Sequence, residues 1–211
     1  MFTGIIQDVG SIERIQHEAE QTHMLFGSKL DMTAWKLGDS VACNGCCLTI
    51  TDFPIATCFA ATLSLETLSL TTFADAIEGA AVNLEPALRM GDALGGHMVT
   101  GHIDGVGRVL ELRDVGEHRE LNFYIPDALA PYVVKKGSVS IDGVSLTVNE
   151  VEMNEMEMEG GGRNNFTVNL IPHTLSHTNL GALQVGAKVN IETDMYGRYV
   201  ERLMQFRVET T

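Results

Sequence analysis

The chain contains two copies of one sequence pattern, and this duplication limits its fold more than any other feature. Asn44–Thr49 returns as Asp142–Thr147, and Thr3–Ile6 returns as Thr100–Ile103. The matching blocks keep the same order and a nearly constant spacing, which is the signature of repeated structural units. We therefore expect two similar domains in tandem.

Within each copy, apolar residues come in short alternating runs that are separated by Gly or Asp. The pairs Asn44-Gly45 and Asp142-Gly143 are typical of the tight turn of a β-hairpin, and alternating runs on either side of a turn indicate strands. About six such strands per copy suit a small closed barrel. The sequence predicts an all-β fold of two tandem similar six-stranded antiparallel β-barrels.

Helical patterns are few. Residues 65–68 and 172–175 indicate the same short helix in the two copies, and residues 126–132 indicate another short turn. Apolar residues at 196, 199, 200, 203 and 206 share one face, which predicts an amphipathic C-terminal α-helix outside the barrels. We expect an N-terminal barrel over 1–96, a second barrel over 97–194, and a helix and tail over 195–211.

Charge and cysteine usage limit the possible partners and compartments. The 14 basic and 28 acidic residues give a net charge of −14, which argues against nucleic acid. No signal peptide and no run of 18 apolar residues is visible, so we expect no membrane partner. Cys43, Cys46, Cys47 and Cys58 make a poor disulfide framework, which favours reduced thiols in a cytoplasmic protein.

Small polar residues stand on strands where apolar residues would normally fill a core. Cys47 and Thr49 share one face of their strand, as Ser145 and Thr147 do in the second copy. Two equivalent positions with a thiol and a hydroxyl indicate a ligand site in each copy. His102 stands where the first copy has Ile5, so the copies differ in acid–base groups although their scaffold is alike.

Two patterns in the sequence have some features of metal or redox sites. Cys43 and Cys46 form a C-x-x-C pattern, but it lacks a second pair and precedes a strand rather than a helix. His173 and His177, or His97 and His102, have spacings that metal ligands can have, without a carboxylate nearby. We expect no metal and no cofactor. The acidic insertion at 150–163 is interpreted as a solvated hairpin extension.

Six motifs in order resemble riboflavin synthase of the alpha-chain type, over residues 1 to about 206. They are Met1–Gln7, Asn44–Thr49, Gly95-Gly96-His97 with Thr100-Gly101-His102, Lys136-Gly137, Ile141–Thr147 and Ile171–Leu175. The resemblance implies disproportionation of two molecules of 6,7-dimethyl-8-ribityllumazine, without a metal or redox cofactor. It also implies a homotrimer with sites between neighbouring chains, and lumazine synthase as a further partner.

The resemblance also assigns residues, in two groups that follow the two copies. The first lumazine would lie against Gly4, Ile5, Ile6, Ser40, Cys47, Leu48, Thr49, Thr62, Leu63, Ser64, Leu65, Glu66 and Thr67. The second would lie against Gly101, His102, Ile103, Ser145, Leu146, Thr147, Asn169, Leu170, Ile171, Pro172, His173 and Thr174, with Lys136 from an adjoining chain.

Four residues are predicted to carry the chemistry. His102 is expected to deprotonate the 7-methyl group of the ring, and Ser145, Cys47 or a water they hold is expected to add to ring carbon 7. Asp194 is expected to orient these groups. A non-catalytic lumazine or flavin carrier of the same fold is the alternative function, because fold does not fix function.

Overall fold

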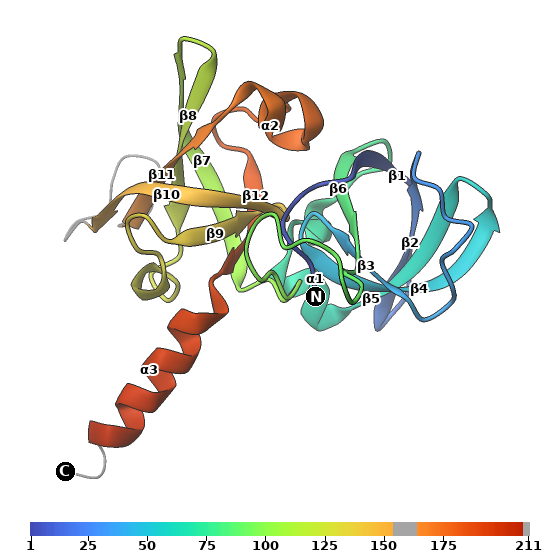
Figure 1. The fold of residues 1–211 in the computed structure, drawn as a ribbon. Coiled ribbons are helices and arrows are strands. Elements are labelled where there is room, and N and C mark those ends of the chain that lie inside the picture. Colours follow the sequence, from blue (N-terminus) through green and yellow to red (C-terminus); the bar gives the residue numbers. More distant parts are fainter. Residues whose placement is uncertain (154–163, 209–211) are drawn as a thin grey trace.

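The computed structural model describes residues 1–153 and 164–208, which form two closed six-stranded antiparallel barrels and a C-terminal helix (Figure 1). The expected all-β fold with a terminal helix is confirmed. Part of the predicted hairpin extension, residues 154–163, lies outside the described residues. The first barrel comprises β1 (Asp8–His17), β2 (Gln21–Gly27), β3 (Ser40–Cys43), β4 (Cys46–Ile55), β5 (Cys58–Ser64) and β6 (Ala81–Pro86).

The second barrel repeats this architecture. It comprises β7 (Gly105–Val115), β8 (His118–Ile125), β9 (Ser138–Ile141), β10 (Val144–Met153), β11 (Asn164–Leu170) and β12 (Lys188–Thr193). The short helices α1 (Leu65–Leu70) and α2 (Pro172–His177) follow the fifth strand of each barrel, as predicted, and each precedes a 3-10 helix, Thr72–Asp75 or Asn179–Ala182. A third 3-10 helix, Ala130–Tyr132, falls within the turn predicted at 126–132.

Alternation along β4 and β10 points the polar site residues predicted on these strands away from the barrel cores. Along β4, Cys46, Leu48 and Ile50 are buried, while Cys47 is half-buried and Thr49 is exposed. The strand β10 repeats this pattern. Burying alternate apolar side chains stabilises each barrel by roughly 1.5–3 kcal/mol per large residue. The intervening residues therefore point away from the barrel core, and Cys47 packs instead against the small cluster of Phe2, Ala42 and Val99.

The residues just before the first strand of each barrel, 2–6 and 99–103, are called here the entry segments. Each entry segment packs on the other barrel. Ile6, just before β1, packs against the core of the second barrel. Ile103, just before β7, belongs to the core of the first barrel. Phe2 and Val99 pair as an antiparallel bridge and are both fully buried. The two entry segments therefore cross, and they join the barrels into one structure.

The two Asx-Gly hairpin turns meet back to back where the barrels join. A Cβ added to Gly45 would lie 2.7 Å from the Gly143 nitrogen, and one added to Gly143 would lie 2.7 Å from the Gly45 nitrogen. Asn44 and Asp142 have φ values of 43° and 45°, as a primed two-residue turn requires. Only glycine permits this approach, which explains why both copies carry Asx-Gly.

A buried set of amide side chains surrounds these turns with local two-fold symmetry. Asn83 Nδ2 donates to the Asp142 carbonyl at 2.9 Å, and Asn190 Nδ2 donates to the Asn44 carbonyl at 2.8 Å. The Asn83 N–H reaches Asn44 Oδ1, and the Asn190 N–H reaches Asp142 Oδ1, both at 2.8 Å. Because every one of these bonds is buried or partly buried, breaking one leaves an unsatisfied polar group.

Asp142 breaks the chemical symmetry of this interface, because its counterpart is the neutral Asn44. Burial raises the pKa of Asp142 from its usual 3.8 to about 7, against the hydrogen bonds from the Asn190 N–H and the Asn179 side chain. The folded protein therefore keeps a proton that the unfolded chain releases near pH 4. This contribution to stability is complete below pH 4 and is lost as the pH rises through about 7.

Replacing Asp142 by asparagine is expected to raise the free energy of unfolding at pH 8 by about 1–3 kcal/mol, because no buried charge forms. Urea denaturation at pH 5 and pH 8 measures the effect. The pKa values of Glu85 and Glu192 are also raised by burial, but both carboxyls remain in the variant and cancel in the comparison. An equal loss of stability between the two pH values in both proteins would contradict this account.

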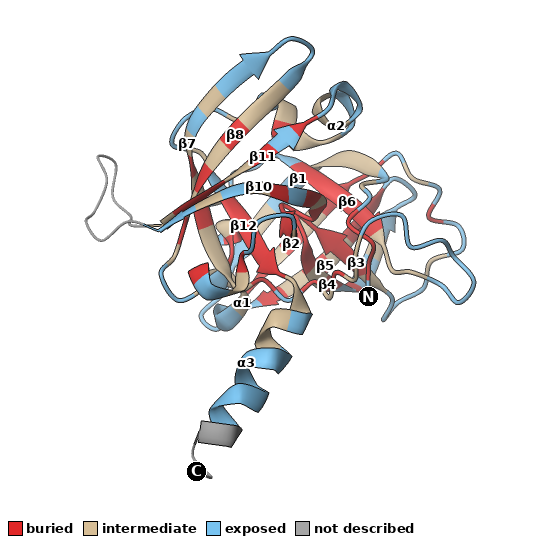
Figure 2. Cartoon of the chain, turned by 60° about the vertical axis from the view of Figure 1, so that its left-hand side comes forward, coloured by how far each residue is buried: buried red, intermediate tan, exposed pale blue. Residues whose placement is uncertain are grey.

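The helix α3 (Met195–Val208) projects away from both barrels (Figures 1 and 2). Its base is fixed by a 2.7 Å ion pair between Arg198 and Asp104 and by a hydrogen bond from the Tyr132 hydroxyl to Glu201. Six of its apolar side chains are exposed, whereas Met195 at its start is half-buried. The exposed ones are Tyr196, Tyr199, Val200, Leu203, Met204 and Phe206. No helix within the described residues is long and apolar enough to cross a membrane.

Candidate functional site

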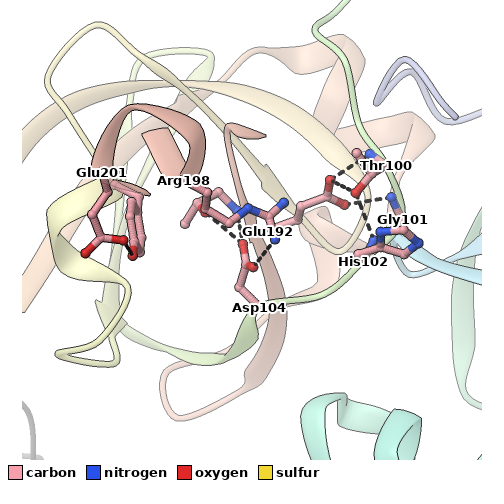
Figure 3. Close-up of polar contacts among 9 residues, drawn as sticks. Thr100, Gly101, His102, Asp104, Glu192, Arg198 and Glu201 are labelled. Carbon is pink, nitrogen blue, oxygen red and sulfur yellow. Dashed lines mark hydrogen bonds and ion pairs between the residues drawn. The ribbon is translucent and has the colours of Figure 1, made fainter. Parts of the chain in front are cut away.

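Each entry segment is held by one buried glutamate. Glu85 on β6 accepts from the Thr3 N–H at 2.6 Å, the Thr3 hydroxyl at 2.7 Å and the Gly4 N–H at 3.0 Å. Glu192 on β12 accepts from the same three groups of Thr100 and Gly101, at 2.6, 2.8 and 2.9 Å (Figure 3). Each Thr-Gly segment is therefore fixed by a carboxylate of its own repeat.

These glutamates were not predicted as site residues, although a signal for them existed. Glu85 and Glu192 end the matching blocks Gly79–Glu85 and Gly186–Glu192 of the two copies. A glutamate at an otherwise buried strand position indicates a hydrogen-bonded carboxylate. Burial raises the pKa of both carboxyls, and the three bonds that each accepts act in the opposite direction.

The structure groups the predicted residues differently from the expectation, because each Thr-Gly segment contacts the strand of the other barrel. The Cys47 N–H donates to the Gly101 carbonyl at 2.8 Å, and the Ser145 N–H donates to the Gly4 carbonyl at 2.8 Å. Which lumazine each group meets stays a prediction, but the pairing within the chain differs from the expected association of Gly4 with Cys47 and of Gly101 with Ser145. The crossing of the entry segments is the physical reason.

The first cluster, defined by Cys47, Thr49 and His102, therefore lies on the first barrel. The Cys47 side chain is half-buried, and Thr49 and His102 are exposed. Thr49 lies opposite Ser40 across the β3–β4 pair. Burial raises the pKa of Cys46 to about 12 and raises that of Cys43 well above its usual value, which disfavours the nucleophilic thiolate at both positions.

The second cluster, defined by His97, Ser145 and Asp194, lies on the second barrel. His97 Nδ1 lies 2.7 Å from Ser145 Oγ. Burial lowers the pKa of His97, and the Asp194 carboxylate acts in the opposite direction. His97 was not among the predicted site residues, although it stands in one of the six motifs. Lys136 is exposed, with φ 66°, near the start of β9.

The ends of β5 and β11 carry the remaining predicted residues. Thr62 Oγ1 lies 2.9 Å from His23 Nδ1 on the neighbouring strand, so His23 joins the candidate residues of the first barrel. Ser64 caps α1 through the Thr67 N–H at 3.1 Å. Leu63 and Leu170 are fully buried, so their side chains belong to the cores and only their backbone can meet a ligand. The others are half-buried or exposed: Leu65, Glu66, Asn169, Ile171, Pro172, His173 and Thr174.

Two hollows flank the barrels. One of about 660 Å³ is lined by Ile5, Ser40 and Glu85 among others, and one of about 840 Å³ lies between α3 and the start of β9, with Asp194 at its edge. Cys47, His102 and Ser145 line neither hollow. His102 is exposed, and Cys47 and Ser145 are half-buried.

His173 and His177 stack with ring centroids 4.0 Å apart. Within residues 1–153 and 164–208, no group of three or more His, Cys, Asp or Glu is arranged to hold a metal ion. All four cysteines are free thiols. The chemistry that the described site offers is acid–base and nucleophilic, through imidazole, hydroxyl and thiol groups.

Comparison with known proteins shows where this arrangement belongs. The Lumazine binding domain family matches residues 3–87 and 100–194. A riboflavin synthase of Brucella abortus (strain 2308) is 40% identical over 98% of this chain and its own whole length, and one of Photobacterium phosphoreum is 42% identical over 97% of this chain and 89% of its own.

A solved structure, LumP complexed with riboflavin, is similar with a TM-score of 0.78 and 28% identity, over 92% of this chain and 100% of that one. LumP complexed with 6,7-dimethyl-8-(1'-D-ribityl) lumazine is similar with a TM-score of 0.77 and 26% identity, over 92% and 99%. The whole-length identity to riboflavin synthases is higher than that to LumP. The chain belongs to the riboflavin synthase family, built from two lumazine binding domains.

Proposed function

We propose that this chain is a transferase that disproportionates two molecules of 6,7-dimethyl-8-ribityllumazine. A four-carbon unit passes from one molecule to the other, which gives riboflavin and 5-amino-6-(ribitylamino)uracil. The observation that carries the proposal is identity of 40% to 42% with riboflavin synthases over nearly the whole chain. The reacting lumazine ring itself accepts the displaced electrons, so the proposed reaction needs no redox cofactor.

Each barrel is proposed to hold one lumazine next to its crossed entry segment. On the first barrel, the ring lies by Cys47, Thr49 and His102; on the second, by Ser145, Thr147 and Ile5. Hydroxyl groups suit the ribityl chain, and backbone groups suit the pyrimidinedione edge. His102 removes a proton from the 7-methyl group of one lumazine, and Ser145 supports addition at ring carbon 7 of the other.

The reaction is proposed to take place between chains. Two lumazines must meet face to face, yet the two clusters stand on the surfaces of different barrels of one chain. A first barrel of one chain and a second barrel of its neighbour, in a homotrimer, bring the clusters together and allow Lys136 to reach in. The division into 1–96, 97–194 and 195–211, a cytoplasmic location and lumazine synthase as a supplier of substrate belong to the same proposal.

The helix α3 is proposed to hold the trimer. Its apolar face is a large exposed patch of the kind that marks an interface. A Val200→Asp, Leu203→Asp double variant is expected to lower the assembly state and, because sites are shared, to lower turnover with it. Light scattering measures the first and riboflavin formation the second. An unchanged trimer would contradict the assignment of this face. The matched control is Gln205→Glu, which adds an exposed negative charge to the same helix off the apolar positions.

A carrier of lumazine or flavin is the second candidate, because LumP shares the fold. Turnover separates the two. Purified protein mixed with the lumazine alone, with a chelator present, is expected to produce riboflavin absorbance with two lumazines consumed for each riboflavin formed. A bound chromophore without turnover would leave the carrier as the function.

A further inference from the structure

The contact between His97 and Ser145 links a nucleophile to a base outside the predicted set. The Nδ1–Oγ distance of 2.7 Å is that of a strong hydrogen bond. The segment before His97 is tightly fixed: a Cβ at Gly96 would lie 2.2 Å from the Thr3 carbonyl oxygen and 2.8 Å from Ser145 Cβ. The His97 N–H also donates to that Thr3 carbonyl at 3.1 Å. The backbone of Gly96 and His97 is therefore fixed beside Thr3 and Ser145.

The tautomer of His97 decides the direction of this hydrogen bond. In the tautomer that carries its proton on Nε2, the Ser145 hydroxyl donates to Nδ1, and Ser145 Oγ has no other hydrogen-bond partner among the described residues. The ring proton of neutral His97 then stands on Nε2, which is buried without a partner in the described part of the chain. An imidazole that accepts from a serine hydroxyl in this way has the arrangement of an activating base.

We propose that His97 is the general base for Ser145. This rests on the proposed function. As Ser145 Oγ bonds to ring carbon 7, its O–H bond breaks and the proton moves to His97 Nδ1. The displaced electron pair enters the conjugated pyrimidinedione of the substrate. When the adduct collapses, the Oγ–carbon bond breaks and the proton returns, so nothing is oxidised or reduced.

The two histidines then have separate roles. His102, on the first barrel, serves the lumazine that loses its methyl proton, and His97, on the second, serves the lumazine that is attacked. No hydrogen bond from a described residue reaches the Cys47 sulfur, so the equivalent position of the first barrel lacks such a base. The asymmetry between the copies assigns addition to the second barrel.

Steady-state kinetics of the full-length protein test this assignment. His97→Ala is expected to lower kcat by about 100-fold while KM changes less than about 3-fold. Added imidazole should restore part of the rate. A His97→Ala, Ser145→Ala double variant should be no slower than Ser145→Ala alone, because the two groups act as a unit. The matched control is His17→Ala, since His17 Nδ1 makes a similar contact with Thr22 Oγ1, at 3.1 Å, outside the site.

Lumazine fluorescence checks that each variant still binds. If His97→Ala does not fold, His97→Gln replaces it, because glutamine keeps an acceptor for Ser145 but cannot take its proton. The same loss of kcat is expected. The pH profile of kcat should also lack the limb that His97 controls. A kcat within about 3-fold of wild type, or losses that multiply in the double variant, would overturn the assignment. A wild-type protein that makes no riboflavin would instead overturn the proposed function.

Discussion

Replacing His102 by glutamine is expected to lower turnover of lumazine by about 10²–10⁴-fold, the usual result of losing a general base. Glutamine keeps the size and polarity of the side chain but cannot accept a proton near neutral pH. Because His102 is exposed and its N–H contact to Thr100 Oγ1 comes from the backbone, the fold and lumazine affinity should change little. Stopped-flow absorbance of riboflavin formation measures the rate.

The control is His118→Gln, at the exposed end of the β7–β8 hairpin, where the same exchange should leave turnover unaltered. If the two variants had similar small effects, the methyl proton would have to leave to water or to another group. The difference between His102 and its counterpart Ile5 would then have no chemical meaning.

Replacing Gly101 by alanine is expected to lower the free energy of unfolding by about 3–5 kcal/mol, as the sum of backbone strain and overpacking. Its φ is +83°, and a Cβ would lie 2.5 Å from Cys47 Cβ and 2.9 Å from the Cys47 nitrogen. The variant must therefore push the entry segment off the first barrel. Urea denaturation measures the loss.

Gly79 provides a matched control, because its φ is +85° and nothing lies within 4 Å of an added Cβ. Gly79→Ala is expected to cost only about 1–2 kcal/mol, from backbone strain alone. The difference between the two variants isolates the contact of the entry segment with Cys47. Equal losses would mean that Gly101 does not press against the first barrel in solution.

Most of the fold could be predicted from the sequence because its signals are local. Alternation along Cys46–Ile50 and the Asx-Gly turns specify strands and hairpins wherever they occur. The repeat then fixes that two such barrels follow one another. The helix at 195–208 was also visible, because its apolar face has a helical period and no strand pattern competes with it.

The grouping of the site could not be predicted, because the two copies are nearly interchangeable. Gly4 would satisfy the same hydrogen bond with Cys47 as with Ser145, and only the crossing of the entry segments chooses between them. That crossing depends on long-range contacts, such as Ile6 and Ile103 in the opposite cores. His97 was missed for a related reason, since a lone histidine in a Gly-rich linker has no periodic neighbours to indicate its partner.

The proposal that one reaction uses two barrels from different chains is tested most directly by mixing two inactive variants. His102→Gln disables the first-barrel cluster, and Ser145→Ala disables the second. When the two chains are refolded together in equal amounts, sites that join the intact first barrel of one to the intact second barrel of the other should make up about a quarter of the total. Riboflavin formation well above the sum of the separate proteins is the predicted result, and activity that stays at that sum would contradict a site shared between chains.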